Sequence, residues 1–125
     1  MLHAKILYVE DDELLQLTVA ELLEAEGWRV ETCADGVAAL ALVESETHYD
    51  LFLFDNHLPG LTGAELAARA RGLEHRRRTP VLIISATECG REARRAGADE
   101  FLKKPEGMNQ LAGVCGRLLS AGVSR

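Results

Sequence analysis

The sequence lacks a long apolar run. No stretch approaches the ~18 apolar residues that would span a bilayer. The amino-terminal MLHAKILYVEDD has no charged stretch followed by a long apolar segment, which a secretion signal would need. We therefore expect a cytoplasmic protein with no membrane partner.

Cysteine is also scarce. The three cysteines, Cys33, Cys89 and Cys115, are odd in number, widely spaced and without a CxxC or Cys/His pairing. This pattern argues against a disulfide framework and against a zinc site. We expect reduced thiols with packing or surface roles.

An excess of positive charge is missing as well. The formal net charge is -6, with 14 Lys and Arg against 20 Asp and Glu. Because proteins hold nucleic acid phosphates with patches of Lys and Arg, this balance argues against nucleic acid as the main partner. The one basic cluster, Arg76-Arg77-Arg78, falls in an expected loop. We predict that it is solvated, with a docking patch for an acidic partner as the alternative.

The chain has no linker, internal repeat or low-complexity tract. Its 125 residues are enough for one hydrophobic core and too few for two functional units. We therefore expect a single domain over residues 1–125.

Short apolar runs alternate with longer segments of helical period, a pattern typical of βαβ units and a parallel sheet covered on both faces. This predicts an α/β fold with a five-stranded, doubly wound parallel sheet. The predicted strands are Lys5–Val9, Arg29–Cys33, Leu51–Asp55, Val81–Ser85 and Glu100–Lys103. The predicted helices run from about Glu13 to Glu26, Val37 to Glu46, Thr62 to Gly72, Glu88 to Ala96 and Met108 to Ser120.

Polar side chains stand at the carboxyl ends of four of these strands. Glu10 and Asp11 follow the first strand, Asp55 ends the third, Ser85 ends the fourth and Lys104 follows the fifth. In doubly wound sheets, ligands bind beyond the carboxyl ends of the strands. Carboxylates gathered at one edge repel one another unless a hard cation lies among them, so we predict Mg²⁺ coordination there.

The same residues suit phosphoryl transfer. A carboxylate is a poor nucleophile toward an anionic phosphodonor, because like charges repel. A metal ion together with Lys104 would remove that repulsion and stabilise the oxygens of the transferring group. Asp55 is then the candidate phosphoryl acceptor.

Four segments, LYVEDDE, LFLFDNHLPGLTG, LIISATE and AGADEFLKKPE, carry a recognisable pattern. In this order they resemble the receiver domain of two-component response regulators over essentially the whole chain. The resemblance implies a flavodoxin-like fold and a stand-alone, chemotaxis-regulator-like receiver with no output domain. It also implies a signalling switch rather than an enzyme. The implied partners are a sensor histidine kinase or a histidine phosphotransfer protein, and a downstream protein target.

The resemblance also implies roles for individual residues. Asp55 is the phosphoacceptor, Glu10 and Asp11 hold Mg²⁺, with Asp11 the more direct ligand, and His57 offers its backbone carbonyl to the metal. Asp12 is expected to be a surface or helix-capping acid.

The remaining implied residues lie on the fourth and fifth strands. Ser85 and Phe101 form the switch, and Ser85 hydrogen-bonds the phosphoryl group. Lys104 forms an ion pair with the phosphoryl group, and the Lys104-Pro105 bond is cis. Between Ser85 and Lys104 the chain is ~3–4 residues, about one helical turn, shorter than the family pattern.

Two alternatives stay open at this stage, and a third is disfavoured. The chain can be a receiver excised from a hybrid kinase or longer regulator. It can be a binding scaffold that is not phosphorylated. An aspartyl phosphatase of the haloacid dehalogenase type is disfavoured, because that family needs a second Asp where this sequence has His57.

Overall fold

The structure, a computed structural model, describes residues 3–123. The ends of the predicted domain, residues 1–2 and 124–125, lie outside the described residues. The strands are β1 (Lys5–Val9), β2 (Arg29–Cys33), β3 (Leu51–Asp55), β4 (Val81–Ser85) and β5 (Glu100–Lys103). The helices are α1 (Glu13–Glu24), α2 (Gly36–Glu44), α3 (Gly63–Gly72), α4 (Gly90–Arg95) and α5 (Leu111–Val123), with 3-10 turns η1 (Glu74–Arg76) and η2 (Met108–Gln110).

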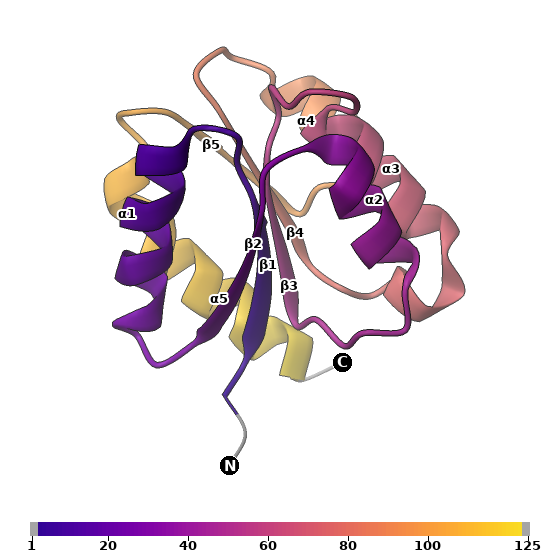
Figure 1. The fold of residues 1–125 in the computed structure, drawn as a ribbon, viewed down its shortest axis with the longest axis horizontal. Helices are drawn as coiled ribbons and strands as arrows, with labels where there is room; N and C mark the ends of the chain where they lie inside the picture. The colour runs from indigo at the N-terminus through magenta and orange to yellow at the C-terminus, as the bar shows by residue number, and fades with distance from the viewer. Residues whose placement is uncertain (1–2, 124–125) are drawn as a thin grey trace.

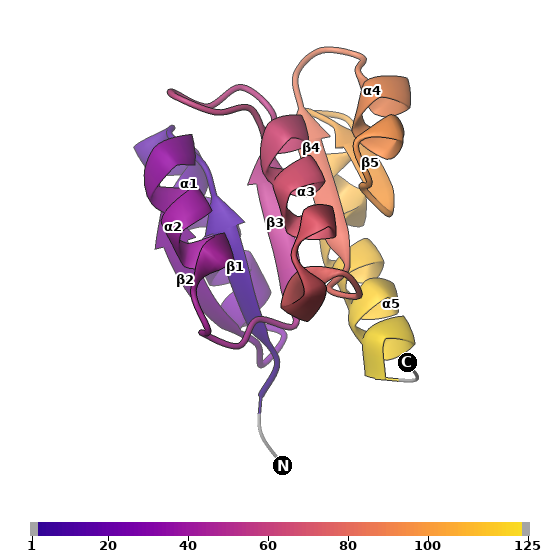
Figure 2. The ribbon, with the colours of Figure 1, turned by 90° about the vertical axis from the view of Figure 1, so that its right-hand side faces the viewer.

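The sheet is parallel throughout, with strand order β2-β1-β3-β4-β5. The winding therefore reverses between β1 and β3, which is where this type of sheet places its ligands. Helices α1 and α5 cover one face, and α2, α3 and α4 cover the other (Figure 1). Turned by 90°, the molecule presents α2, α3 and α4 in front of the sheet (Figure 2). The predicted doubly wound α/β architecture is confirmed.

Two apolar cores form because the side chains of a strand alternate between its faces. On β1, Leu7 and Val9 belong to the core under α2, α3 and α4, and Ile6 and Tyr8 belong to the core under α1 and α5. All four are fully buried. The alternation continues past the end of the strand, and it sets the direction of the polar residues that follow.

All five predicted strands are confirmed, whereas the helix ends differ by a few residues. The second helix starts at Gly36, because the Asp35 carboxylate caps it by accepting from Ala38 N at 2.7 Å. The fourth helix is only six residues long. It starts at Gly90, whose N–H donates to the Glu88 carboxylate at 3.1 Å in the preceding loop. The last helix begins as the 3-10 turn η2, becomes α-helical at Leu111 and ends at Val123.

Two other helices have side-chain caps, and the capping role predicted for Asp12 is confirmed. Asp12 accepts from Leu15 N at 3.0 Å and so caps α1. Thr62 and Glu65 form a reciprocal capping box at the start of α3. Both fix the direction in which the chain leaves the carboxyl end of a strand, and therefore the position of the loops there.

The prediction that the Arg76-Arg77-Arg78 cluster is solvated is wrong for Arg76, which is only 2% exposed. Its guanidinium donates to the carbonyls of Val43 at 2.9 Å and Ser45 at 2.8 Å, at the carboxyl end of α2. It also lies over the rings of Tyr49 and Phe52, at 5.2 Å and 5.5 Å from their centroids. A helix carboxyl end carries partial negative charge, which favours a cation there. Arg76 thus joins η1 to α2.

Candidate functional site

The residues predicted to form a site do meet at the carboxyl edge of the sheet. The period of two along the strands sorts them by face. Glu10 lies two residues after Tyr8, and Asp55 two residues after Leu53, so both point to the α1 and α5 face. Lys104, two residues after Leu102, shares that face. These three side chains therefore converge from β1, β3 and the end of β5.

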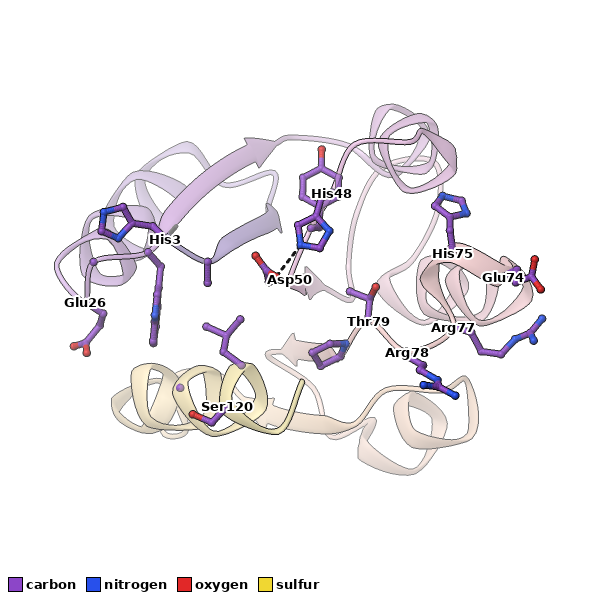
Figure 3. A pocket seen from close by; sticks show the side chains of 17 residues that line it. His3, Glu26, His48, Asp50, Glu74, His75, Arg77, Arg78, Thr79 and Ser120 are labelled. Carbon is purple, nitrogen blue, oxygen red and sulfur yellow. Dashed lines mark hydrogen bonds and ion pairs between the residues drawn. The ribbon is translucent and has the colours of Figure 1, made fainter. Parts of the chain in front are cut away.

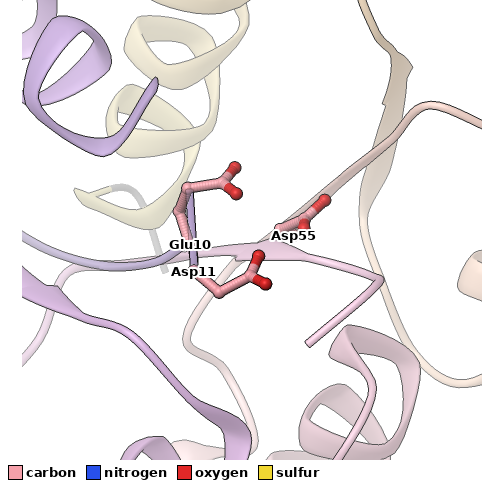
Figure 4. Close-up of side chains that lie close together, drawn as sticks. All are labelled: Glu10, Asp11 and Asp55. Atoms are coloured by element: carbon pink, nitrogen blue, oxygen red, sulfur yellow. The ribbon is translucent and has the colours of Figure 1, made fainter. Parts of the chain in front are cut away.

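Three carboxylates form the centre of the site (Figure 4). Oxygens of Glu10, Asp11 and Asp55 lie within 4.8 Å of one another. Glu10 and Asp55 are 1% and 3% exposed, whereas Asp11 is exposed to solvent. Two buried acids and one accessible acid therefore share one small volume.

Lys104 bridges the two buried acids. Its ammonium nitrogen lies 3.3 Å from Glu10 Oε1 and 3.2 Å from Asp55 Oδ1. The contact to Glu10 is a hydrogen bond. The contact to Asp55 is an ion pair without hydrogen-bond geometry, so among the described residues Asp55 Oδ1 is a buried oxygen with no hydrogen-bond donor.

The surroundings of the site raise the pKa of both buried acids and of the lysine. Burial raises the pKa of the Asp55 carboxyl above its ordinary value, although the Lys104 ammonium opposes the shift. Burial also raises the pKa of Glu10, with the Asp12 backbone N–H opposing. Burial alone would lower the pKa of Lys104, but the Asp55 and Glu10 carboxylates outweigh it and leave that pKa raised.

The donor set fits a hard divalent cation. Such ions take carboxylate oxygens as ligands, and Mg²⁺ keeps several waters beside one or two carboxylates. Asp11 offers an accessible carboxylate, and Asp55 offers a buried oxygen that lacks a donor. A cation here would also offset the repulsion among the carboxylates, which adds to the effect of burial on the pKa of Glu10 and Asp55.

Ser85 is fully buried at the end of β4, on the opposite face of the sheet from Asp55. Its hydroxyl lies 3.2 Å from the Thr87 hydroxyl and accepts from Thr87 N at 3.2 Å. The Thr87 hydroxyl in turn lies 3.0 Å from His57 Nε2. A hydrogen-bonded chain thus links the loop after β3 to the loop after β4. Sequence reasoning missed Thr87, although its place two residues after Ser85 was a signal.

The other predicted residues are also near. Phe101 is half-buried and packs against the first turn of α4, where a Cβ on Gly90 would lie 3.2 Å from Phe101 Cδ2. The predicted cis Lys104-Pro105 bond is confirmed. Because a Cβ at position 90 would crowd the Phe101 ring, the close approach of Phe101 to α4 depends on Gly90.

A separate depression of about 1030 Å³ lies at the amino ends of the strands, far from the acids (Figure 3). It is lined by apolar side chains such as Trp28 and Leu119 and by several polar groups. His48 Nε2 already pairs with Asp50 Oδ1 at 2.8 Å, and His75 Nε2 lies 2.8 Å from the Ser45 carbonyl. The chemistry predicted from the sequence belongs to the opposite edge.

Comparison with known proteins identifies the family of this chain. A sequence profile described as the response regulator receiver domain matches residues 6–115. The chain belongs to that family. Receiver domains are signalling modules of two-component systems rather than conventional enzymes, and the predicted family and fold are confirmed. The match also sets aside the haloacid dehalogenase alternative.

Sequence relatives of this receiver domain are mostly larger proteins. It is 37% identical over 118 residues to the gliding motility regulatory protein of Myxococcus xanthus, covering 91% of this chain and 15% of that protein. It is 37% identical over 110 residues to the transcriptional regulatory protein TcrA of Mycobacterium tuberculosis, covering 86% of this chain and 42% of that protein. The chain thus spans less than half the length of these curated relatives.

Solved structures match over nearly the full chain. The receiver domain of a Pseudomonas aeruginosa sensor histidine kinase, with a magnesium ion coordinated in its active site cleft, has a TM-score of 0.84 and 31% identity. That match covers 95% of this chain and 99% of the other. A CheY-like receiver from Methanospirillum hungatei has a TM-score of 0.88 and 27% identity, with 98% of both chains covered. Within the described part of this receiver domain, no helix is both long and apolar enough to cross a membrane.

Proposed function

We propose that this receiver domain accepts a phosphoryl group on Asp55, with Mg²⁺ held by Asp11, Asp55 and the His57 backbone carbonyl, and with Glu10 in support. The observation that carries this proposal is the buried Asp55 oxygen that faces Lys104 and has no hydrogen-bond donor. A buried carboxylate oxygen that has an ion pair but no hydrogen-bond donor is costly in a purely structural role and is suited to a nucleophile. Histidine kinases and histidine phosphotransfer proteins carry phosphohistidine, which supplies the reactive bond.

In this reaction, a carboxylate oxygen of Asp55 forms a bond to phosphorus while the bond from phosphorus to the donor nitrogen breaks. The bound metal supplies positive charge that offsets the charge of the transferring group. Lys104, 3.2 Å from Asp55 Oδ1, reorients toward a phosphoryl oxygen. The leaving imidazole takes its proton from water. Because the step depends on positioning and electrostatics, it needs no further acid or base from this chain.

We infer that the phosphoryl group shifts a conformational equilibrium through Ser85 and Phe101. The Ser85 hydroxyl exchanges its Thr87 partner for a phosphoryl oxygen. Phe101, which packs on α4 at Gly90, moves into the space that Ser85 vacates. A ligand shifts populations only through contacts that differ between states, and these are two such contacts. The output is binding of a downstream protein, or onward transfer of the phosphoryl group.

A surface beside the site can bind the protein that donates the phosphoryl group. Helix α1 starts just after the acids, and its Leu14 and Leu17 are 74% and 59% exposed. Large apolar side chains exposed together mark protein interaction surfaces. We propose that the phosphohistidine-bearing protein packs on these two leucines while its imidazole reaches Asp55.

The metal role of Asp11 gives a direct test. Asp11→Asn should weaken Mg²⁺ binding at least about tenfold, since loss of supporting groups around a metal already costs that much. Isothermal titration calorimetry measures the affinity, and phosphorylation by acetyl phosphate should require correspondingly more Mg²⁺. Asp12→Asn is the matched control, because the Asp12 carboxylate caps α1 and an Asn side chain can do the same. Equal Mg²⁺ affinity in the Asp11 variant and wild type would contradict the proposed site.

The His57 ring should influence how long the phosphoryl group survives. The contact of its Nε2 with the Thr87 hydroxyl, which in turn lies 3.2 Å from the Ser85 hydroxyl, supports this expectation, because it directs the imidazole toward the proposed site. We expect His57→Ala to change the rate of dephosphorylation by about threefold or more, within the contribution of one positioned polar group. Thr87→Val removes the partner but keeps the ring. If both variants lose the phosphoryl group at the wild-type rate, the ring is a bystander.

A further inference from the structure

Tyr8 is a fully buried tyrosine whose hydroxyl points at the site. It lies on β1 in the core under α1 and α5, and its ring has no exposed surface. The period of two brings its side chain under that of Glu10, and its hydroxyl donates to Glu10 Oε1 at 3.4 Å. A buried hydroxyl without a partner would be costly, and among the described residues Glu10 supplies that partner.

Glu10 depends on few donors. Its Oε2 accepts from Asp12 N at 3.2 Å, and its Oε1 is shared by the Tyr8 hydroxyl and by Lys104 Nζ at 3.3 Å. At 1% exposure, this carboxylate has little access to water that could replace a lost donor. Its position is therefore set by three groups, of which Lys104 is the strongest because it is charged.

The Lys104 ammonium cannot bind the Glu10 carboxylate and the oxygens of a phosphoryl group on Asp55 equally well. The ammonium bridges Glu10 and Asp55 while Asp55 is unmodified. A phosphoryl group on Asp55 brings further oxygens and more negative charge, and it attracts the ammonium away from Glu10. Glu10 Oε1 then keeps one protein donor, the Tyr8 hydroxyl. At 3.4 Å that hydrogen bond is longer than the usual optimum, so it has room to shorten when Lys104 moves.

We propose that the Tyr8 hydroxyl is a positioning group of this site, holding the Glu10 carboxylate in place when Lys104 turns to the phosphoryl group. The inference rests on the proposed phosphoryl acceptance at Asp55. Tyr8 would then have two roles: its ring fills the core, and its hydroxyl holds Glu10 when Asp55 carries a phosphoryl group. The phenylalanine that shares its shape would fill the core equally well but would lack the donor.

Tyr8→Phe tests this directly, since it removes one oxygen and keeps the ring. Groups that hydrogen-bond to metal ligands typically contribute about 10–100-fold to metal affinity. The hydrogen bond from Tyr8 is long while Asp55 is unmodified, so we expect a smaller contribution in that state. We expect Mg²⁺ affinity by calorimetry to fall about threefold. Affinity for beryllofluoride at saturating Mg²⁺, followed by ¹⁹F NMR, should fall about tenfold, because Lys104 has then left Glu10.

Tyr49→Phe is the matched control. Tyr49 is the other buried tyrosine of the described chain, and its hydroxyl donates to Glu31 at 2.9 Å on the opposite face of the sheet. It should leave both affinities unchanged. Urea unfolding, measured without ligands and again with Mg²⁺ and beryllofluoride, separates stability from binding. A purely structural role for Tyr8 would lower the free energy of unfolding equally under both conditions.

The outcomes distinguish this inference from the proposed function. If wild type binds Mg²⁺ and beryllofluoride and Tyr8→Phe matches it within about twofold, the positioning role is wrong and phosphoryl acceptance stands. Equal losses in the Tyr8 and Tyr49 variants would also overturn the role. If wild type itself binds neither ligand, the proposed function fails first.

Discussion

Replacing Asp55 with Asn should abolish phosphoryl labelling of this receiver domain. The amide nitrogen and oxygen of Asn keep the shape of the side chain but remove the nucleophilic carboxylate. With acetyl phosphate and Mg²⁺, intact-mass spectrometry should find one added phosphoryl group on wild type and none on Asp55→Asn. A carboxylate that makes the new bond is not replaceable by its neighbours, so we expect a loss of at least about a thousandfold in rate.

Two features of the variant make the result interpretable. The introduced amide carries no charge, so the repulsion among the three acids falls and the fold should be at least as stable as wild type. Asp12→Asn, at an exposed carboxylate outside the metal cluster, should be labelled normally. Labelling of Asp55→Asn to the wild-type extent would move the phosphoacceptor to another side chain.

Replacing Arg76 with Ala should produce the largest loss of stability among the changes considered. The substitution leaves the Val43 carbonyl of α2 without its donor, removes one of the two partners of the Ser45 carbonyl, and opens space beside two aromatic rings. Each buried carbonyl left unsatisfied costs about 1–3 kcal/mol. We expect a decrease of about 3 kcal/mol in the free energy of unfolding by urea, out of a total of about 5–15 kcal/mol. The melting temperature should fall by about 10 °C.

Arg77 provides the matched control, because it neighbours Arg76 in sequence but is exposed. Arg77→Ala should change the free energy of unfolding by less than about 0.5 kcal/mol. Arg76→Lys should recover only part of the loss, since an ammonium lacks the planar fork that reaches several carbonyls at once. An Arg76→Ala variant as stable as Arg77→Ala would show that the buried guanidinium contributes nothing net.

The site was predictable because its chemistry sits at the ends of strands that the sequence marks clearly. The run LFLFD indicates a buried strand and ends with the Asp55 carboxylate, and the run VLIIS indicates another buried strand and ends with the Ser85 hydroxyl. Strands buried on both faces must be continuously apolar, so their ends are sharp in the sequence. Parallel pairing then brings those ends to one edge, whatever the loops do.

Helix boundaries were less predictable, because side chains in the loops decide them. Helix α4 has only one buried apolar side chain, that of Ala93, so no apolar period marks its start at Gly90, where the Glu88 carboxylate accepts from Gly90 N. The 3-10 turn η2 before α5 likewise follows from local hydrogen bonds rather than from the apolar period. The energy differences between such endings are small compared with burial of a strand.

The sequence did not predict which polar side chains would form hydrogen bonds with groups far away along the chain. Arg71 donates from Nε to the Gly97 carbonyl at 3.0 Å and from Nη2 to Asp99 at 2.8 Å, and so ties α3 to the loop before β5. Arg76, in a run of three arginines, is buried while its neighbours are exposed. Nothing in the run itself separates the three.

The sequence by itself determined the fold, the edge that carries the chemistry and the candidate phosphoacceptor, because apolar period and strand ends are local properties. Only the tertiary structure decided which groups share a donor. It placed Lys104 between Glu10 and Asp55, turned the Tyr8 hydroxyl toward Glu10 and linked His57 to Thr87. The physical reason is that hydrogen bonds and ion pairs depend on distances of a few tenths of an ångström between distant segments, which packing of the whole sheet sets.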